Sequence, residues 1–176
     1  MRYRRALIGG ATYFFTVNLA NRSHHLLVDR IEDLREVVRD VRRAHPFEIV
    51  AWVVMPDHLH AIWQLPDDDD DFAMRWGLIK AGFSRRIPKD ERIRPSRMKK
   101  GERGIWQRRF WEHLIRDDSD RQRHVDYIHY NPVKHGYVQR AVDWPFSTFH
   151  RFLRLGWVTA DWGCQDDFTG DFGEPT

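Results

Sequence analysis

The first part of the chain switches between two spacings of apolar residues. Residues 12–19 are rich in β-branched and aromatic side chains, which predicts a strand. Residues 29–45 carry apolar side chains every three or four positions, which predicts an amphipathic helix. Asp29 and Glu32 have the spacing of a capping box at its start, and Pro46 is expected to end it.

Two more strands are predicted to form a hairpin. Residues 47–54 are apolar on both faces, which predicts a central strand. A turn at residues 55–57 leads into residues 58–65. A side-chain period of two places His58 and His60 on one face of this strand and an apolar set on the other.

The second half of the chain predicts a helix followed by a strand. Residues 72–87 have apolar side chains at helical spacing, and Asp71 is expected to cap this helix. Residues 110–116 predict a fourth strand. Glu112 and His113 on it could be site residues, but structural strand positions are the preferred interpretation for both.

A third long helix is predicted from Ser119, which begins a capping-box pattern, to about Tyr130. It is expected to end there because a following proline disfavours helical geometry at the residue before it. Val125 and Ile128 mark its buried side. At about 100° per residue, Tyr127 points roughly 130° away from them and is expected to lie outside the core.

The order strand, helix, strand, strand, helix, strand is the ferredoxin-like βαββαβ plan, an α+β fold with an antiparallel sheet. This plan places the strand with the two histidines centrally, under a C-terminal helix that carries Tyr127. We expect one domain over residues 1–160, including a basic arm at residues 1–10. An acidic, flexible tail is expected at residues 161–176.

Composition excludes several classes of protein. The 176 residues are 41% hydrophobic and 14% aromatic, so the chain can bury a core and is not disordered as a whole. No apolar run approaches the ~20 residues that cross a bilayer, and the N-terminal segment lacks a signal-peptide cleavage site. A lone Cys164 excludes an internal disulfide and a multi-cysteine zinc site, and it indicates the cytoplasm.

Positive charge lies in the body of the chain. All 29 Lys and Arg precede residue 161, whereas five of the 26 acidic residues lie at residues 161–176. Together with eight Trp, this favours a polyanionic partner, although a basic protein with buried Trp explains the composition equally well. The candidate DNA-binding residues lie in the arm, in a long basic stretch and after the third helix: Arg2, Tyr3, Arg4, Arg5, Arg85, Arg86, Lys99, Lys100, Arg103, Arg108, Arg109 and Lys134.

One group of residues suggests a reaction. His58 and His60 can bind one divalent cation, although a His-x-His pair in a strand is a weak signal by itself. Asn131 lies one helical turn after Tyr127, on the same side. The cation would polarise a phosphodiester and the Tyr127 phenol would attack phosphorus, with Lys134 helping the phenolate to form.

Longer motifs resemble a known family. MPDHLHAIW, followed further along by YIHYNPVKHG, resembles the HUH single-tyrosine transposases. RYRR, GGATYFFTVNL, WQRRFWEHLIRDD and WPFSTFHRF resemble more closely the REP-associated tyrosine transposases. The resemblance covers roughly residues 2–153.

The resemblance implies a role for each residue of this group. His58 and His60 would bind Mg²⁺ or Mn²⁺, with Asn131 as third ligand where related insertion-sequence transposases carry Gln. Tyr127 would cleave single-stranded DNA, forming a 5′-phosphotyrosine and a 3′-hydroxyl that can reverse the reaction. Arg2–Arg5 would help to read a tetranucleotide beside a REP hairpin. The expected partner is single-stranded DNA with REP-like hairpins, bound by a monomer, although relatives with swapped helices act as dimers.

Two other functions stay open. The chain could be a regulator that binds DNA hairpins without cutting them, or a metallohydrolase that uses water, with Tyr127 merely structural. Tyr130 competes with Tyr127 as the nucleophile, and the acidic tail is expected to compete with DNA for the basic surface. Three further histidines are expected at the surface near phosphate: His124, His129 and His135.

Overall fold

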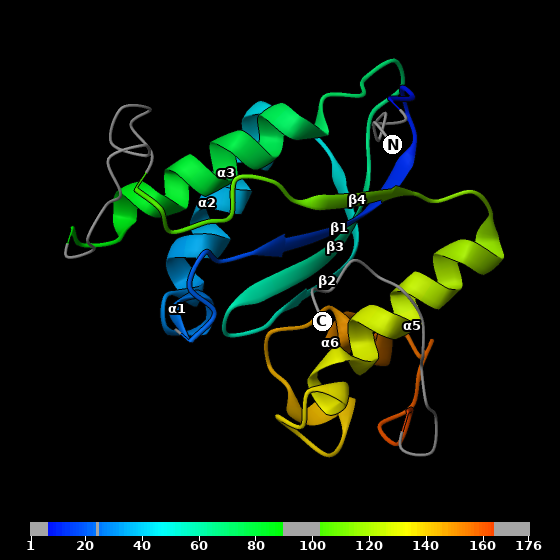
Figure 1. Cartoon of the computed structure of the whole chain (residues 1–176). Coiled ribbons are helices and arrows are strands. Elements are labelled where there is room, and N and C mark those ends of the chain that lie inside the picture. The colour runs from blue at the N-terminus through cyan, green and yellow to red at the C-terminus, as the bar shows by residue number, and fades with distance from the viewer. Residues whose placement is uncertain (1–6, 24, 90–102, 164–176) are drawn as a thin grey trace, which may run out of the picture.

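The computed structural model describes residues 7–23, 25–89 and 103–163. Within them, the strands form one antiparallel sheet in the order β2-β3-β1-β4 (Figure 1). The strands are β1 (Thr12–Asn18), β2 (Glu48–Val54), β3 (His58–Gln64) and β4 (Trp111–Leu114). This order and the intervening helices confirm the ferredoxin-like prediction, with β3 central.

Two long helices cover one face of the sheet. They are α2 (Ile31–Ala44), which follows the short α1 (Leu26–Asp29), and α3 (Phe72–Arg86). Their apolar stripes pack on Phe15, Leu59 and Trp63 in the larger of two buried clusters. The helices approach closely at Gly82, where a Cβ atom would lie 2.7 Å from a methyl group of Val37. This side of the sheet is therefore an apolar core.

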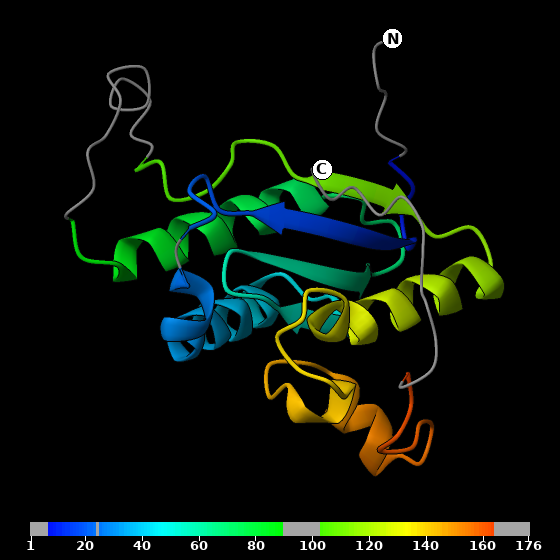
Figure 2. The same cartoon turned by 60° about the horizontal axis from the view of Figure 1, so that its bottom comes forward.

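A third long helix, α5 (Asp118–Lys134), covers the opposite face (Figures 1 and 2). It packs on Phe14 and Ile62 through Val125, Tyr127 and Ile128. The two histidines of β3 lie on this face, as the period-two pattern predicted, because the alternate residues Leu59 and Ala61 belong to the other cluster.

The prediction that β2 is a central strand is wrong, because β2 lies at an edge of the sheet. Its outer edge is covered by a segment that comes much later in the chain. The Val54 amide donates to the Phe146 carbonyl at 2.9 Å, and the Thr148 amide donates to the Trp52 carbonyl at 2.9 Å. The strand is apolar on both faces because a helix packs on each face, not because strands flank it on both sides.

The helix starts differ from the predicted capping boxes. Helix α2 begins after Arg30, which makes no side-chain cap, so the Asp29–Glu32 box is wrong. Asp117, not Ser119, caps α5, and its carboxylate accepts from the Asp120 amide at 2.8 Å. The predicted cap of α3 is confirmed, because Asp71 accepts from the Met74 amide.

Helix α5 does not end at Tyr130 but continues through Pro132 to Lys134. Its last turn is closed by two backbone bonds, from Gly136 to Val133 at 2.9 Å and from Tyr137 to Pro132 at 3.0 Å. Gly136 has φ +71°, which completes a Schellman motif. This closure fixes the last turn despite the proline.

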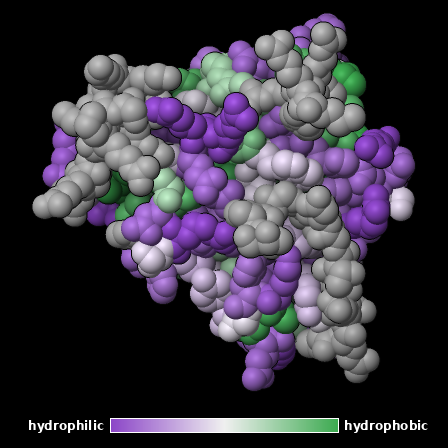
Figure 3. Space-filling model, in the orientation of Figure 1, coloured by the Kyte–Doolittle hydropathy of each residue, from purple (hydrophilic) through white to green (hydrophobic). Residues whose placement is uncertain are grey.

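The described residues after α5 include η1 (Ala141–Asp143) and α6 (Phe149–Arg154), and this segment packs beside α5. Among the described residues, no helix is both long and apolar enough to cross a bilayer. The face seen in Figure 3 is mostly hydrophilic. The predicted domain boundaries at residues 10 and 160 stay predictions.

Candidate active site

His58 and His60 lie side by side on β3, with ring centroids 5.0 Å apart. Their exposed fractions are 2% and 0%. On the neighbouring strand β1, Asn18 lies opposite His58 and Thr16 lies opposite His60. The two imidazoles therefore share one buried, polar position on the α5 face of the sheet.

Hydrogen bonds orient both rings through Nδ1. The Asp57 carboxylate contacts Nδ1 of His58 at 2.7 Å, and the Thr16 hydroxyl contacts Nδ1 of His60 at 2.9 Å. An ionised carboxylate only accepts hydrogen bonds, so this contact selects the neutral tautomer of His58 in which Nδ1 carries the proton and Nε2 carries the lone pair. Nε2 of His58 is buried and has no hydrogen-bond partner among the described residues. This is the form of histidine that binds a metal.

Asp57 is held in its charged form. Burial raises the pKa of this carboxyl, but hydrogen bonds from His58 and Arg22 outweigh it and lower the pKa to about 2. The Arg22 guanidinium donates to the carboxylate at 2.6 Å. Asp57 therefore remains ionised at neutral pH and keeps His58 in one orientation.

One side of α5 faces these two rings. The ring of Tyr127 lies 5.2 Å from that of His60, and the ring of His135 lies 5.3 Å from that of His58. Asn131 is fully buried and lies one helical turn from each of them. The structure thus brings Tyr127 next to the two histidines selected from the sequence, and Asn131 lies on the same side of α5.

The prediction that Tyr127 lies outside the core is wrong, because its exposed fraction is 1%. Its ring packs on Phe14 at 6.2 Å, and its hydroxyl accepts a hydrogen bond from Nζ of Lys134 at 3.1 Å. Nζ also lies 4.7 Å from the centre of the ring. Lys134, predicted as a DNA-binding residue, is thus in contact with the candidate nucleophile. The rival Tyr130 is partly buried beside Gly163.

Comparison with known proteins gives the family. A family model described as "Transposase IS200 like" matches residues 10–131. The chain belongs to the IS200-like transposase family. It is 49% identical to a REP-associated tyrosine transposase of Escherichia coli over 95% of this chain and 94% of the relative. A Haemophilus influenzae protein is 48% identical to this chain, over 94% of this chain and 94% of that protein.

A solved structure supports the same assignment. A REP-associated tyrosine transposase bound to a REP hairpin is 46% identical to the chain, with a TM-score of 0.85. The match covers 100% of this chain and 98% of that one. The chain is therefore a member of the REP-associated tyrosine transposases, enzymes of the transposase type with a tyrosine nucleophile.

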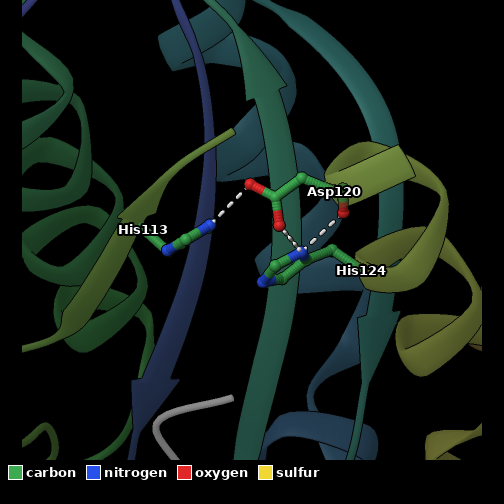
Figure 4. A group of neighbouring side chains, drawn as sticks. All are labelled: His113, Asp120 and His124. Atoms are coloured by element: carbon green, nitrogen blue, oxygen red, sulfur yellow. Dashed lines mark hydrogen bonds and ion pairs between the residues drawn. The ribbon is translucent and has the colours of Figure 1, made fainter. Parts of the chain in front are cut away.

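This transposase has a second polar cluster that the sequence did not predict. His113 of β4 contacts the Asp120 carboxylate at 2.8 Å, and Nδ1 of His124 contacts the Asp120 carbonyl at 2.7 Å (Figure 4). The other carboxylate oxygen lies 3.2 Å from Nδ1 of His124. The two imidazoles stack at 4.6 Å, and the Arg116 amide also donates to the carboxylate, at 3.0 Å.

The three side chains His113, Asp120 and His124 offer ligand atoms within 4.8 Å of one another. Each of these side chains has a polar contact within the cluster, so we interpret the cluster as a brace between β4 and the start of α5. Burial lowers the pKa of His124 and favours its neutral form. Burial alone would raise the pKa of Asp120, but hydrogen bonds from His113 and Arg116 lower it. The i, i+4 spacing of Asp120 and His124 was the available signal in the sequence.

Two of the three histidines predicted at the surface are buried. His124 lies in the brace, and His129 has an exposed fraction of 1% and packs against Phe149 and Phe152. Burial lowers the pKa of His129 to about 3. The prediction is confirmed for His135, which is exposed.

Apart from Lys134, the predicted DNA-binding residues fall into three groups. Arg86 forms an ion pair with Glu36 of α2, and Arg103 donates to carbonyls at the end of α3. Arg85 is exposed on α3, and Arg108 and Arg109 are exposed just before β4, where the Gln107 amide donates to the Asn18 carbonyl at 3.0 Å. The rest lie outside the described residues: Arg2, Tyr3, Arg4, Arg5, Lys99 and Lys100.

Proposed function

We propose that this transposase binds REP-like hairpins and cleaves and rejoins the adjoining single-stranded DNA through a 5′-phosphotyrosine on Tyr127. The observation that carries the proposal is the position of Tyr127. Its ring packs on His60, and its hydroxyl contacts a lysine ammonium. The hairpin bound to the related solved structure supports the choice of substrate.

The donor set fits Mg²⁺ or Mn²⁺, which His58, His60 and Asn131 would hold. Nε2 of His58 is buried, oriented by Asp57 and without a hydrogen-bond partner among the described residues. Imidazole nitrogens and amide oxygens are ligands that Mn²⁺ accepts, and Mg²⁺ binds through oxygens and retained water. A bound cation would polarise the phosphodiester and stabilise charge in the transition state.

A side chain of the protein can help Tyr127 to act as a nucleophile. An ordinary tyrosine has a pKa of about 10 and is a weak nucleophile at neutral pH. The ammonium of Lys134 favours the phenolate because it is a positive charge 3.1 Å from the oxygen. The phenolate oxygen then bonds to phosphorus, the bond from phosphorus to the 3′ oxygen breaks, and that oxygen leaves as a hydroxyl after taking up a proton.

DNA binding is assigned to basic residues around this site. Arg108 and Arg109 are exposed beside the end of β1 that carries Asn18, opposite His58. They are suited to phosphates of the strand that enters the site. Arg2–Arg5 keep their predicted role at the hairpin and its tetranucleotide. A monomer is expected to be sufficient, since both halves of the site come from one chain.

A covalent adduct tests the proposal. The full chain is mixed with a hairpin oligonucleotide that carries single-stranded flanks, in the presence of Mn²⁺, and resolved by denaturing electrophoresis. We expect an adduct with the unmodified protein and with the matched control Tyr130→Phe, but none with Tyr127→Phe.

Two outcomes would contradict the proposal in different ways. Tight hairpin binding without any adduct, across a panel of REP-like substrates, would support the regulator. Cleavage that persists in Tyr127→Phe but is lost in His58→Ala would support a metallohydrolase that uses water.

A further inference from the structure

The segment after α5 holds the side chain of Tyr137 in a defined position at the surface. Its backbone is the last residue of the Schellman motif, in which its amide donates to the Pro132 carbonyl at 3.0 Å. Because the same helix carries Tyr127 and Asn131, the position of Tyr137 is fixed relative to the candidate active site.

The ring of Tyr137 packs on a side chain that is itself held in place. It packs on the indole of Trp144 at 5.4 Å. Trp144 is held in turn, because its Nε1 donates to the Val54 carbonyl at the end of β2 at 3.0 Å. Tyr137 nevertheless has an exposed fraction of 45%, so much of the side chain remains available for contact. Exposed and yet rigidly supported, it resembles an aromatic stacking surface.

A series of rings connects Tyr137 to the metal-binding residues. His135 lies 6.5 Å from Tyr137 and 5.3 Å from His58. Partial burial and the charge of Asp57 both raise the pKa of the Tyr137 hydroxyl, so the ring is neutral beside a polyanion. Of the nearby cations, Arg22 is paired with Asp57, and Lys134 lies in the last turn of α5 with its Nζ at the Tyr127 hydroxyl. An exposed neutral ring next to a site for phosphate suits a strand whose phosphates and bases alternate.

We propose that Tyr137 stacks on an unpaired nucleobase next to the phosphate bound at His58 and His60. The inference rests on the proposed function, since it assumes that a single strand enters this site. It adds a way for the site to select single-stranded over duplex DNA. In a duplex, the bases are already stacked on one another and none is free to cover the ring.

Binding to two strands of equal charge tests this role. Fluorescence anisotropy measures the affinity of the full chain for an oligothymidine of about twelve nucleotides and for an abasic strand of the same length. Tyr137→Ala is expected to weaken oligothymidine binding roughly tenfold and to leave abasic binding unchanged. Tyr137→Phe, which keeps the ring, is expected to bind both strands as the unmodified protein does.

Trp157→Ala is the matched control, because Trp157 is also exposed, at 65%, but packs on Phe152 of α6. It is expected to bind both strands unchanged. The inference is overturned if Tyr137→Ala changes both affinities equally or neither, or if Tyr137→Phe loses as much as Tyr137→Ala. These assays need no cleavage. If the protein forms the adduct but Tyr137→Ala changes neither affinity, only this inference is rejected. If Tyr137→Ala weakens oligothymidine binding alone but no adduct forms, only the proposed chemistry is rejected.

Discussion

The two faces of the sheet are built from alternate residues of the same strands, yet their contents differ. The face under α2 and α3 carries Leu59, Ala61 and Trp63 from β3, packed among apolar and aromatic side chains. The face under α5 carries His58 and His60 from the same strand. One face therefore supplies stability from burial of apolar surface, and the other holds polar groups that need partners.

Burying polar groups has a cost that the α5 face offsets with hydrogen bonds. Asp57 and Thr16 orient the β3 histidines, and Asp120 contacts both histidines of the brace. Such a face is less stabilising than an apolar one, but it fixes side chains in defined orientations. We infer that the apolar face allows the other face to be used for chemistry.

The largest expected effect is on stability, from the apolar face. Trp63 is fully buried and stacks on Trp76 at 4.2 Å, so Trp63→Ala is expected to lower the free energy of unfolding by about 3–5 kcal/mol. Urea unfolding measures this change. A loss below about 1 kcal/mol would contradict the assignment of this face as the main source of stability.

On the polar face, Asp57→Asn is expected to weaken metal binding while the fold persists. The neutral amide loses the charge that holds Nδ1 of His58, and changes at such supporting groups lower metal affinity by about 10–100-fold. Calorimetric titration with Mn²⁺ measures the affinity. Asp143→Asn, at the exposed last residue of η1, is the control and should bind Mn²⁺ unchanged. Equal affinities in all three proteins would argue against the site.

Acid should destabilise the molecule through His129. Its pKa is about 3 in the fold against 6.5 as the ordinary value, so below pH 6.5 the unfolded chain takes up a proton that the fold excludes. Stability present above pH 6.5 is then lost progressively as the pH falls towards 3. From pH 7 to pH 5 we expect a loss of about 2 kcal/mol, seen by urea unfolding and largely removed in His129→Gln. An unchanged loss in that variant, with exposed His135→Gln as control, would contradict this assignment.

The smallest expected effect concerns Lys134. Removing its ammonium in Lys134→Met should slow adduct formation about tenfold, because the phenolate loses one nearby cation. Lys89→Met, at an exposed position after α3, is the control. A uniform loss of DNA affinity with an unchanged cleavage rate would instead support the phosphate-binding role that the sequence suggested.

The period of two in β3 predicted correctly which face holds His58 and His60, because strand geometry alone decides it. The motif spacing likewise selected Tyr127, which α5 places beside His60. The edge position of β2 could not be predicted, since its partner, residues 146–148, is remote in the sequence.

The burial of Tyr127, His124 and His129 was missed for a related reason. A single apolar stripe describes a helix with one buried side, but α5 packs on both the sheet and the C-terminal segment. His129 contacts that segment, whereas Tyr127 faces the sheet. Local patterns carry no information about packing on a second side.

The central claim is that His58 and His60 act together with Tyr127 and not with another nucleophile. After reaction with a hairpin oligonucleotide and Mn²⁺, the protein is digested with trypsin and the modified peptide is fragmented by mass spectrometry. Cleavage after Arg123 and Lys134 gives one peptide that contains both Tyr127 and Tyr130. We predict that a nucleotide is joined to Tyr127 through its 5′-phosphate. A nucleotide joined to Tyr130, or cleaved DNA with no modified tyrosine, would contradict the account.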